Sequence, residues 1–269
     1  MKAALRSLFC ILLLPAITFA QVNTRNDGND NPPKAPNGKT KVLIIPWEPI
    51  TFNVSSDVSR AISNETGQKY DQIEESLRKG LVDQLKKSFG PTCSVTSLLD
   101  DTAKMKKDLR YTYVVTQRSY TPVNFPLNPT KADSAKLNAP KQGTSNGQIQ
   151  TTDDETDKFM NCTVLSPNLL GYLHAKYGAD YIIFINEIDI DNNFGADPYN
   201  TQGKTDYVRD VVVHWTIYSA TTEKRVAAGK SKGTFSSATN TPSKISSGAF
   251  SAIAKDIYSR YLAGIKPKK

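Results

Sequence analysis

The chain has few of the residues that build metal clusters or cysteine-rich scaffolds. Its 269 residues include two histidines and three cysteines, which excludes a zinc cluster of several Cys and His ligands and a disulfide-dense small fold. Positive charge is only in modest excess, with 34 Lys and Arg against 26 Asp and Glu. No basic stripe alternates with aromatic residues, so the composition gives no indication of nucleic-acid binding.

Long apolar runs are absent after the first twenty residues, so the sequence predicts no membrane-spanning helix. Residues 1–20 combine two basic residues, a short apolar run and small residues at their end, which is the pattern of a secretory signal peptide. We expect cleavage after Ala20; an N-terminal membrane anchor is the alternative. Cys10 follows Phe9 rather than a small residue, so it does not fit a lipid-attachment site. The expected location is therefore periplasmic or extracellular.

The rest of the chain reads as one interrupted domain. Residues 21–40 hold Asn, Asp, Gly and Pro with almost no apolar side chain, which is typical of a disordered tether. Residues 41–265 carry the apolar patterns of a folded domain with enough core-forming residues. Residues 124–158 interrupt that domain with a polar stretch rich in Pro, Gly and Asn, which predicts a flexible insertion.

Apolar periodicity predicts the secondary structure of this domain. Continuous apolar runs predict buried strands, three- and four-residue repeats predict helices, and alternation predicts a terminal hairpin. In chain order the expected elements are a strand at 41–46, a short helix at 57–63, a helix at 70–89, strands at 93–99 and 109–123, a helix from about 166 to 177, a strand at 181–185, a hairpin of 207–220 with 225–235, and a helix at about 246–262. This order predicts an α/β fold of two or three layers, with parallel core strands, an antiparallel C-terminal hairpin and flanking helices.

Two stretches resemble a family of exported α/β domains. The first is Val42-Leu-Ile-Ile-Pro46, followed by a long loop and a helix ending in Leu81-Val-Asp-Gln-Leu85. The second is Gly178-Ala-Asp-Tyr-Ile-Ile183, followed by the hairpin with Ala227-Ala-Gly-Lys230. The family includes the periplasmic domain of the curli secretion channel, the lipoprotein activators of penicillin-binding proteins and the N-terminal domain of the Tol propeller protein.

The resemblance implies a role in binding or assembly at the cell envelope. It covers about residues 41–100 and 164–263, and residues 101–163 are foreign to it. The channel and activator proteins also carry a lipid-modified cysteine after the leader, and this chain has none there. The resemblance therefore does not extend to pore formation or membrane anchoring.

Motifs for catalysis are missing. The sequence has no serine nucleophile elbow, no glycine-rich phosphate loop and no His-Glu zinc motif. His174 lies in an expected helix and His214 in an expected strand, and neither has a matching partner nearby in the sequence. We read both as structural histidines, and we expect a protein that is not an enzyme.

The segment 189–197 is the best candidate for a metal site. Its sequence places oxygen-bearing side chains at Asp189, Asp191, Asn193 and Asp197. Calcium takes six to eight oxygen ligands, so these residues are candidate calcium ligands, although Phe194 stands where an EF-hand loop needs glycine. The alternative is a polar hairpin loop made of residues that favour turns.

Cys93 and Cys162 are the two cysteines of the mature chain. An oxidising compartment allows them to pair, which would close a loop of about 70 residues. The alternative is two buried thiols that do not react. Neither has a neighbouring histidine or a second cysteine at the spacing of a redox motif.

Four aromatic residues in expected loops are candidates for a recognition surface: Trp47, Phe52, Tyr199 and Tyr207. Aromatic side chains are enriched where proteins bind partners. The alternative is that they cover an edge of the sheet.

Three hypotheses for function remain. The first is a non-catalytic envelope protein that binds a partner protein or assembles at the outer membrane. The second is a module that binds a glycan or small ligand, assisted by calcium. The third is a hydrolase whose catalytic residues are dispersed along the sequence.

Overall fold

The computed structural model describes residues 38–133, 144–145, 148–149, 158–194 and 207–265. The signal peptide and most of the tether expected from the sequence therefore lie outside the described residues. In chain order the elements are β1 (Thr40–Ile45), η1 (Pro49–Thr51), β2 (Phe52–Val54), α1 (Ser56–Thr66), α2 (Tyr70–Phe89), β3 (Cys93–Ser97), α3 (Thr102–Val114), β4 (Thr116–Pro122), β5 (Thr144–Ser145), β6 (Gln148–Ile149), β7 (Lys158–Val164), α5 (Leu169–Tyr177), β8 (Tyr181–Asn193), β9 (Val208–Ser219), β10 (Arg225–Ser236), α6 (Pro242–Ile245), the π-helical turn η4 (Ser246–Phe250) and α7 (Ser251–Ile265).

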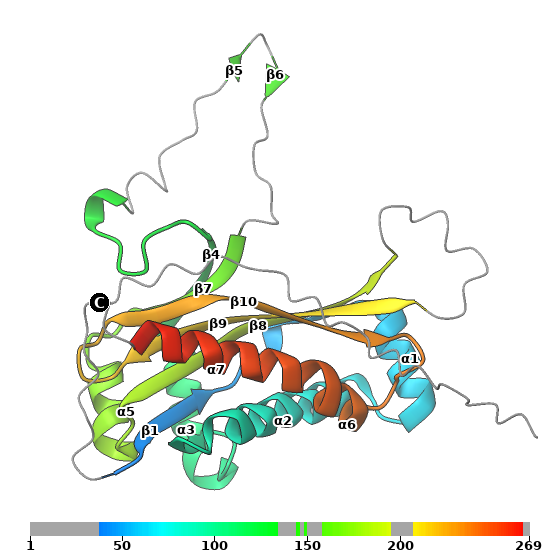
Figure 1. Ribbon diagram of the computed structural model, residues 1–269, viewed down its shortest axis with the longest axis horizontal. Helices are drawn as coiled ribbons and strands as arrows, with labels where there is room; N and C mark the ends of the chain where they lie inside the picture. The colour runs from blue at the N-terminus through cyan, green and yellow to red at the C-terminus, as the bar shows by residue number, and fades with distance from the viewer. Residues whose placement is uncertain (1–37, 134–143, 146–147, 150–157, 195–206, 266–269) are drawn as a thin grey trace, which may run out of the picture.

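A six-stranded mixed sheet forms the middle layer of the fold. Its order is β10-β9-β8-β1-β3, and β2 pairs with β8 beyond the end of β1. Strands β1, β2, β3 and β8 are parallel, whereas β9 runs antiparallel to both of its neighbours, β8 and β10. Helices α2 and α7 cover one face, as Figure 1 shows, and the other face packs against α3, α5 and the short strands β4 and β7. The predicted α/β fold is confirmed.

The continuous apolar run of β1 arises because both of its faces are covered. Val42 and Ile44 belong to the core beneath α2 and α7, while Leu43 and Ile45 belong to the core on the opposite face. All four side chains are buried. Strands covered on both sides lose the apolar–polar alternation of a half-exposed strand, which is why β1 could be recognised from its sequence.

Helix α2 begins and ends where the sequence predicts. Its apolar stripe, from Ile73 to Phe89, is buried against the sheet and α7. The Lys69 backbone N–H donates to Gln72 Oε1 at 2.9 Å, which satisfies one donor at the N-terminus. The closing helix differs from expectation: it starts earlier, as α6, passes through η4 and extends to Ile265.

Residues 109–123 were expected to form a strand, and only the second half of that prediction is right. The segment instead starts inside α3, whose N-cap Asp101 accepts a hydrogen bond from the Lys104 N–H at 3.1 Å. Strand β4 begins at Thr116. The Tyr, Val and Thr content favours strands, but Leu109 and Met105 lie one helical turn apart and pack together into the core.

The first residues of the predicted insertion at 124–158 pack against the sheet. Leu127 is buried, and the Asn128 side chain forms two 2.9 Å hydrogen bonds with the backbone of Arg225 in β10. The Arg225 guanidinium also donates to the Leu127 carbonyl oxygen at 2.9 Å. This part of the segment is therefore tied to the sheet, and Lys158 already belongs to β7.

The disulfide predicted between Cys93 and Cys162 does not form. Both thiols are free and buried. Cys93 lies in the core beneath α2 and α7, and Cys162 lies in the core of the opposite face, so the sheet stands between them. Burial raises the pKa of the Cys162 thiol to about 11, which makes it an unreactive core residue.

Among the described residues, no helix is both long and apolar enough to cross a membrane.

Candidate functional site

The face of the sheet opposite α2 and α7 carries a row of polar side chains on β9. Val213, Trp215 and Ile217 point into the apolar core, so the intervening residues point to the other face. These are His214, Thr216 and Tyr218, and all three are buried. We refer to them as the β9 polar row.

The β9 polar row holds β7 against the sheet. Strand β7 pairs with β4 along one edge, forming a two-stranded ribbon. Along its other edge the Met160 N–H donates to His214 Nδ1 at 2.7 Å, and the Cys162 N–H donates to Thr216 Oγ1 at 3.1 Å. The Tyr218 hydroxyl donates to the Cys162 carbonyl oxygen at 2.9 Å. Side chains thus supply the partners that a neighbouring strand would supply in a continuous sheet.

Thr216 uses its full hydrogen-bonding capacity at the centre of this contact. Besides the Cys162 N–H, its hydroxyl accepts from Asn186 Nδ2 at 2.8 Å and donates to Asn161 Oδ1 at 2.9 Å. Asn186 Nδ2 also reaches the Met160 carbonyl oxygen at 2.8 Å. Both asparagines are buried, so the ribbon is docked through a buried polar network rather than through apolar packing alone.

A bulge in β8 brings acidic side chains onto the same face. The pairing register between β8 and β9 shifts between Ile185 and Glu187. Before the shift the odd-numbered residues of β8 face α2 and α7, whereas after it Ile188 and Ile190 do. Glu187, Asp189 and Asp191 therefore point to the opposite face, where the ribbon lies.

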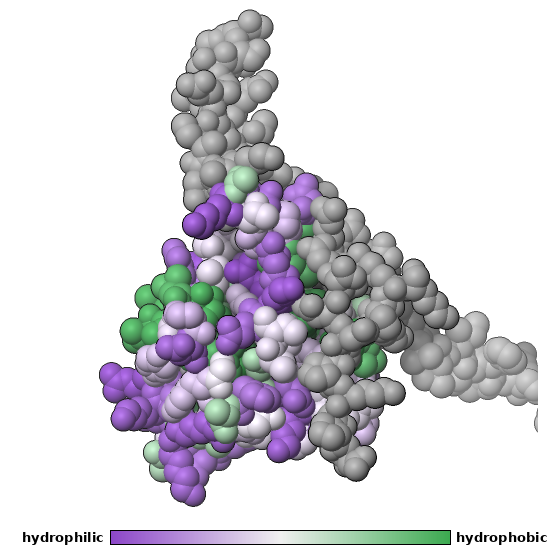
Figure 2. Space-filling model, turned by 90° about the vertical axis from the view of Figure 1, so that its left-hand side faces the viewer, coloured by the Kyte–Doolittle hydropathy of each residue, from purple (hydrophilic) through white to green (hydrophobic). Residues whose placement is uncertain are grey.

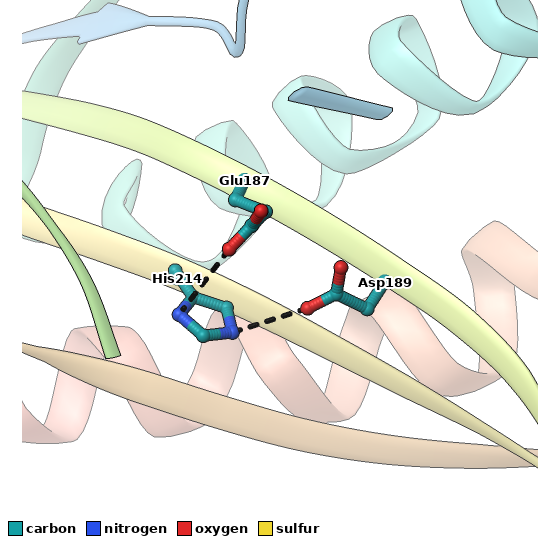
Figure 3. Close-up of side chains that lie close together, drawn as sticks. All are labelled: Glu187, Asp189 and His214. Carbon is teal, nitrogen blue, oxygen red and sulfur yellow. Dashed lines mark ion pairs between the residues drawn. The ribbon is translucent and has the colours of Figure 1, made fainter. Parts of the chain in front are cut away.

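Glu187, Asp189 and His214 form a compact cluster, drawn in Figure 3. His214 Nε2 lies 3.2 Å from Asp189 Oδ2, and Glu187 Oε2 lies 3.8 Å from His214 Nδ1. Asn53 of β2 donates to both carboxylates, at 3.0 Å to Glu187 and 2.9 Å to Asp189. The Tyr120 hydroxyl of β4 donates to Glu187 at 2.7 Å. The cluster thus joins the ribbon to the sheet.

The three groups could in principle hold a metal ion, because one ligand atom from each lies within 4.8 Å of the others. The hydrogen bonds argue against it. The Met160 N–H points at His214 Nδ1, which places the proton of a neutral imidazole on Nε2, facing Asp189. A metal ligand needs a free nitrogen lone pair, so His214 could bind a metal only if it released Met160 or lost the Nε2 proton.

Burial and neighbouring negative charges raise the pKa of two acidic side chains on this face. Burial raises the pKa of Glu187, and Asp189 adds to the effect, while the hydrogen bonds from Tyr120 and Asn53 oppose it. Partial burial also raises the pKa of Asp191, with the carboxylates of Asp189 and Asp210 contributing next. Both acids therefore hold their protons more tightly in the folded chain than in the unfolded one.

A pocket of about 420 Å³ opens beside this cluster. Acidic, basic and aromatic side chains line it together, namely Tyr120, Lys158, Asp189, Asp191, Val212, His214 and Lys230. None of these residues is a serine or cysteine that His214 could activate, and the only lone pair of neutral His214 is already occupied. The described lining of the pocket therefore offers carboxylates, a histidine, lysines and a tyrosine for binding.

The position where α/β folds usually bind ligands is filled by the chain itself. This position is the carboxyl end of the parallel strands, where successive connections leave in opposite directions, here between β1 and β8. The Tyr113 hydroxyl of α3 lies 3.0 and 2.9 Å from the carbonyl oxygens of Pro46 and Trp47, and it accepts a hydrogen bond from Arg78 of α2. Burial raises the pKa of Tyr113 to about 12, so its hydroxyl remains a donor.

Beside Tyr113, the β4 residue Arg118 forms an ion pair with Glu48 at 2.8 Å. Its guanidinium also lies over the Tyr113 ring, 5.2 Å from the centroid. Two side chains of β4, Arg118 and Tyr120, thus reach across the ends of the parallel strands. The ribbon therefore closes the crevice that a substrate would enter.

The candidate calcium ligands do not gather into a loop. Asp189, Asp191 and Asn193 belong to β8, where alternate residues stand about 6.6 Å apart along one face. Asp191 lies opposite Asp210 of β9, and Asn193 donates to Asp210 at 2.9 Å. Asp197 lies outside the described residues. Calcium binding stays a prediction, and the close cluster around Asp189 involves Glu187 and His214 instead.

The predicted aromatic recognition surface is wrong for two of its four members. Trp47 and Phe52 are buried, and their rings stack with centroids 6.0 Å apart. Both belong to the core beneath α2 and α7. Tyr207 is half-buried against Phe194, with centroids 5.1 Å apart. Tyr199 lies outside the described residues.

Sequence reasoning missed Glu187, Asn186 and the role of His214. His214 is structural as expected, but its partner is the backbone of β7, about fifty residues away in the sequence. A signal was present in the alternation of β9, which places three polar side chains on one face of a strand. When one face of a buried strand carries only polar side chains, polar groups of another segment are expected to pack against that face and bond to them.

Comparisons with known proteins leave the family open. No known protein family and no curated protein matches the chain. Among solved structures, the lipoprotein GNA1162 from Neisseria meningitidis is 9% identical with a TM-score of 0.29, covering 84% of this chain and 97% of its own. The hypothetical protein CT253 from Chlamydia trachomatis is 9% identical with a TM-score of 0.33, covering 84% and 95%. Similarities this low carry no argument about function, and the resemblance to the exported α/β domains stays a prediction.

Proposed function

We propose that this chain is an exported, non-catalytic protein of the cell envelope that binds a partner protein. The observation that carries the proposal is the closed crevice at the ends of the parallel strands. Tyr113, Arg118 and Tyr120 occupy it, and each is hydrogen-bonded to the chain's own backbone or to a carboxylate. The location rests on the signal-peptide pattern of residues 1–20.

The polar groups of the site support binding rather than catalysis. His214 and Thr216 are committed to the β7 backbone, and Glu187 to Tyr120 and Asn53. An enzyme keeps its acid, base or nucleophile free to exchange protons with a substrate. Here the same groups hold a secondary structure element in place, which leaves the outer surface as the functional part of the molecule.

Affinity capture followed by reconstitution tests the proposal. The mature chain, residues 21–269, serves as bait in an envelope extract of the source organism, with an unrelated exported protein of similar charge as the control bait. We expect one protein to be retained, and we expect the purified pair to form a complex of fixed stoichiometry in size-exclusion chromatography and calorimetry. Deleting residues 134–157 from the bait then shows whether that segment contributes.

The proposal fails if no complex can be reconstituted from purified components. It also fails if the purified chain turns over an ester, peptide or glycosidic substrate and loses that activity in Glu187→Gln. The first result would leave the ligand-binding hypothesis, and the second would establish an enzyme.

A second candidate function is the binding of a small ligand or cation in the pocket beside His214. The observation in its favour is the convergence of Glu187, Asp189 and His214. Thermal unfolding with added Ca²⁺ or Zn²⁺ separates the two candidates. A metal-dependent rise in the melting temperature that disappears in Asp189→Asn, but remains in the exposed control Asp83→Asn, would favour the second function.

A further inference from the structure

Helix α3 presents an unusual combination of charge and apolar side chains to the solvent. Lys107, Arg110, Tyr111 and Val114 are exposed, and the last three follow Lys107 by three, four and seven residues, so they form a single stripe along the helix. Val114 is 78% exposed and Tyr111 is 42% exposed. Because Val114 stays in contact with water at the end of this basic stripe, it contributes little apolar burial to the stability of the fold.

Helix α5 and the strand before it extend the apolar part of this stripe. The Leu165 N–H donates to the Val115 carbonyl oxygen at 2.9 Å, which brings Leu165, itself 57% exposed, to the end of α3. Tyr172 of α5 is 40% exposed and meets the Tyr111 ring edge-on, with centroids 6.3 Å apart. Two aliphatic and two tyrosine side chains from three segments therefore lie together on the surface.

No acid on α3 balances its bases at the surface. Asp108 is the one acidic residue within α3, and it is buried. Lys176 forms an ion pair with it at 2.7 Å, and Tyr172 and Tyr177 donate hydrogen bonds to it. Despite burial, these bonds lower the pKa of Asp108. Its negative charge is therefore paired with Lys176 and does not offset the exposed bases of α3.

Three of the four bases on α3 remain available. Lys104 pairs with Asp101 at 3.2 Å. Within the described part of the chain, Lys106, Lys107 and Arg110 have neither an ion pair nor a side-chain hydrogen bond, and all three are exposed. Figure 2 faces the end of the molecule where α5 lies and shows a hydrophobic area beside hydrophilic side chains there.

We propose that Lys106, Lys107 and Arg110, with the exposed Val114, Leu165, Tyr111 and Tyr172, form a docking surface for an anionic phospholipid bilayer. Lysine and arginine bind lipid phosphates, tyrosine rings suit the headgroup region, and aliphatic tips enter the acyl boundary. The exposed bases complement the negative charge of such a bilayer, and insertion into it would remove the exposed Val114 and Leu165 side chains from water. The inference rests on the proposed envelope location, but not on the partner protein.

Vesicle binding tests this surface. The mature chain, residues 21–269, retains every residue that the structure describes and lacks the apolar leader. It is mixed with vesicles of phosphatidylcholine alone or of phosphatidylcholine and phosphatidylglycerol in equal amounts, and binding is measured by co-sedimentation and by tyrosine fluorescence. We expect binding only to the vesicles with phosphatidylglycerol, weakening as salt is added.

Two variants separate the two contributions. The triple variant Lys106→Gln, Lys107→Gln, Arg110→Gln should weaken binding at least about tenfold, since each base near an anionic surface contributes measurably. The double variant Val114→Ser, Leu165→Ser should also weaken binding while leaving its salt dependence unchanged. Exposed residues elsewhere provide matched controls without effect: Lys87→Gln, Lys244→Gln, Lys255→Gln for the bases and Val208→Ser for the aliphatic residues.

The proposal is overturned if the chain does not bind phosphatidylglycerol vesicles, or if the control variants weaken binding as much as the surface variants. It is also overturned if the triple variant weakens binding, the double variant does not, and polyglutamate displaces the protein from the vesicles. That pattern would identify a site for an acidic protein. Reconstitution of the partner complex is a separate measurement, so failure of the membrane proposal is distinguishable from failure of the proposed function.

Discussion

The two faces of the sheet are covered in different ways. Beneath α2 and α7 the contact is apolar, with Leu81, Phe250 and Trp215 fully buried in one continuous core. On the opposite face, the ribbon of β4 and β7 is attached through His214, Thr216 and their hydrogen bonds to backbone groups. The first face is stabilised by burial of area, and the second by correct pairing of polar groups.

The two faces therefore contribute to the structure in different ways. Apolar packing tolerates adjustments of shape, whereas a buried hydrogen bond needs its partner at a defined distance and angle. The helix-covered face therefore supplies stability, and the ribbon-covered face specifies where β4 lies across the ends of the parallel strands. That placement brings Arg118 and Tyr120 against Glu48 and Glu187 at this end of the sheet.

The largest effect is expected on the helix-covered face. Leu81→Ala removes a fully buried side chain of α2 and should lower the free energy of unfolding by about 2–5 kcal/mol, because it loses buried area and leaves a cavity. Chemical denaturation measures this. Leu165→Ala, which truncates an exposed leucine, serves as the control with little change. Equal losses in both variants would contradict the assignment of stability to this face.

A smaller but more specific effect is expected on the ribbon-covered face. Thr216→Val keeps the shape of the side chain but removes the partners of the Cys162 N–H and of Asn161 and Asn186. Leaving buried polar groups unpaired should cost about 1–3 kcal/mol. Thr234→Val, at an exposed position of β10, is the control. A Thr216→Val protein as stable as the original would mean that the ribbon is held by other contacts.

The smallest effect is expected at Asp191, and it should be stabilising. The raised pKa means that the folded chain keeps this proton to a higher pH than the unfolded chain does, so the carboxylate destabilises the fold above that window. Asp191→Asn should therefore raise the melting temperature at neutral pH. Below the ordinary carboxyl pKa, both states are protonated and the gain should vanish. A gain that persists in acid would assign the effect to something other than charge.

The elements of the helix-covered face could be predicted because their signal is local. The stripe of α2 and the apolar runs of β1 and β8 each lie within a short stretch of sequence. Strand β1 and helix α2 appear where expected, whereas β8 begins where expected but extends past residue 185 to Asn193. For residues 109–114, the C-terminal part of α3, the Tyr and Val content wrongly predicts a strand. A high content of Tyr and Val predicts a strand correctly only where tertiary packing does not favour a helix instead.

The ribbon and its site could not be predicted, because their contacts join distant segments through backbone atoms. The docking of Met160 onto His214 depends on two groups that are 54 residues apart. Every residue except proline has a backbone N–H, so the sequence does not identify which one donates to His214. The bulge near Asn186 likewise changes which side chains of β8 share a face. Without it, Glu187 would point into the core beneath α2 and α7.

Amide hydrogen exchange at Met160 and Cys162 tests the central claim most directly. These two N–H groups bond only to side chains of β9 rather than to another strand, so their protection reports whether the ribbon stays docked over the crevice. We expect both amides to exchange as slowly as those of the central strand β8, and to lose this protection in Thr216→Val. Exchange of both at the rate of unprotected amides would show that the ribbon lifts away from the sheet and that the crevice is open to a substrate.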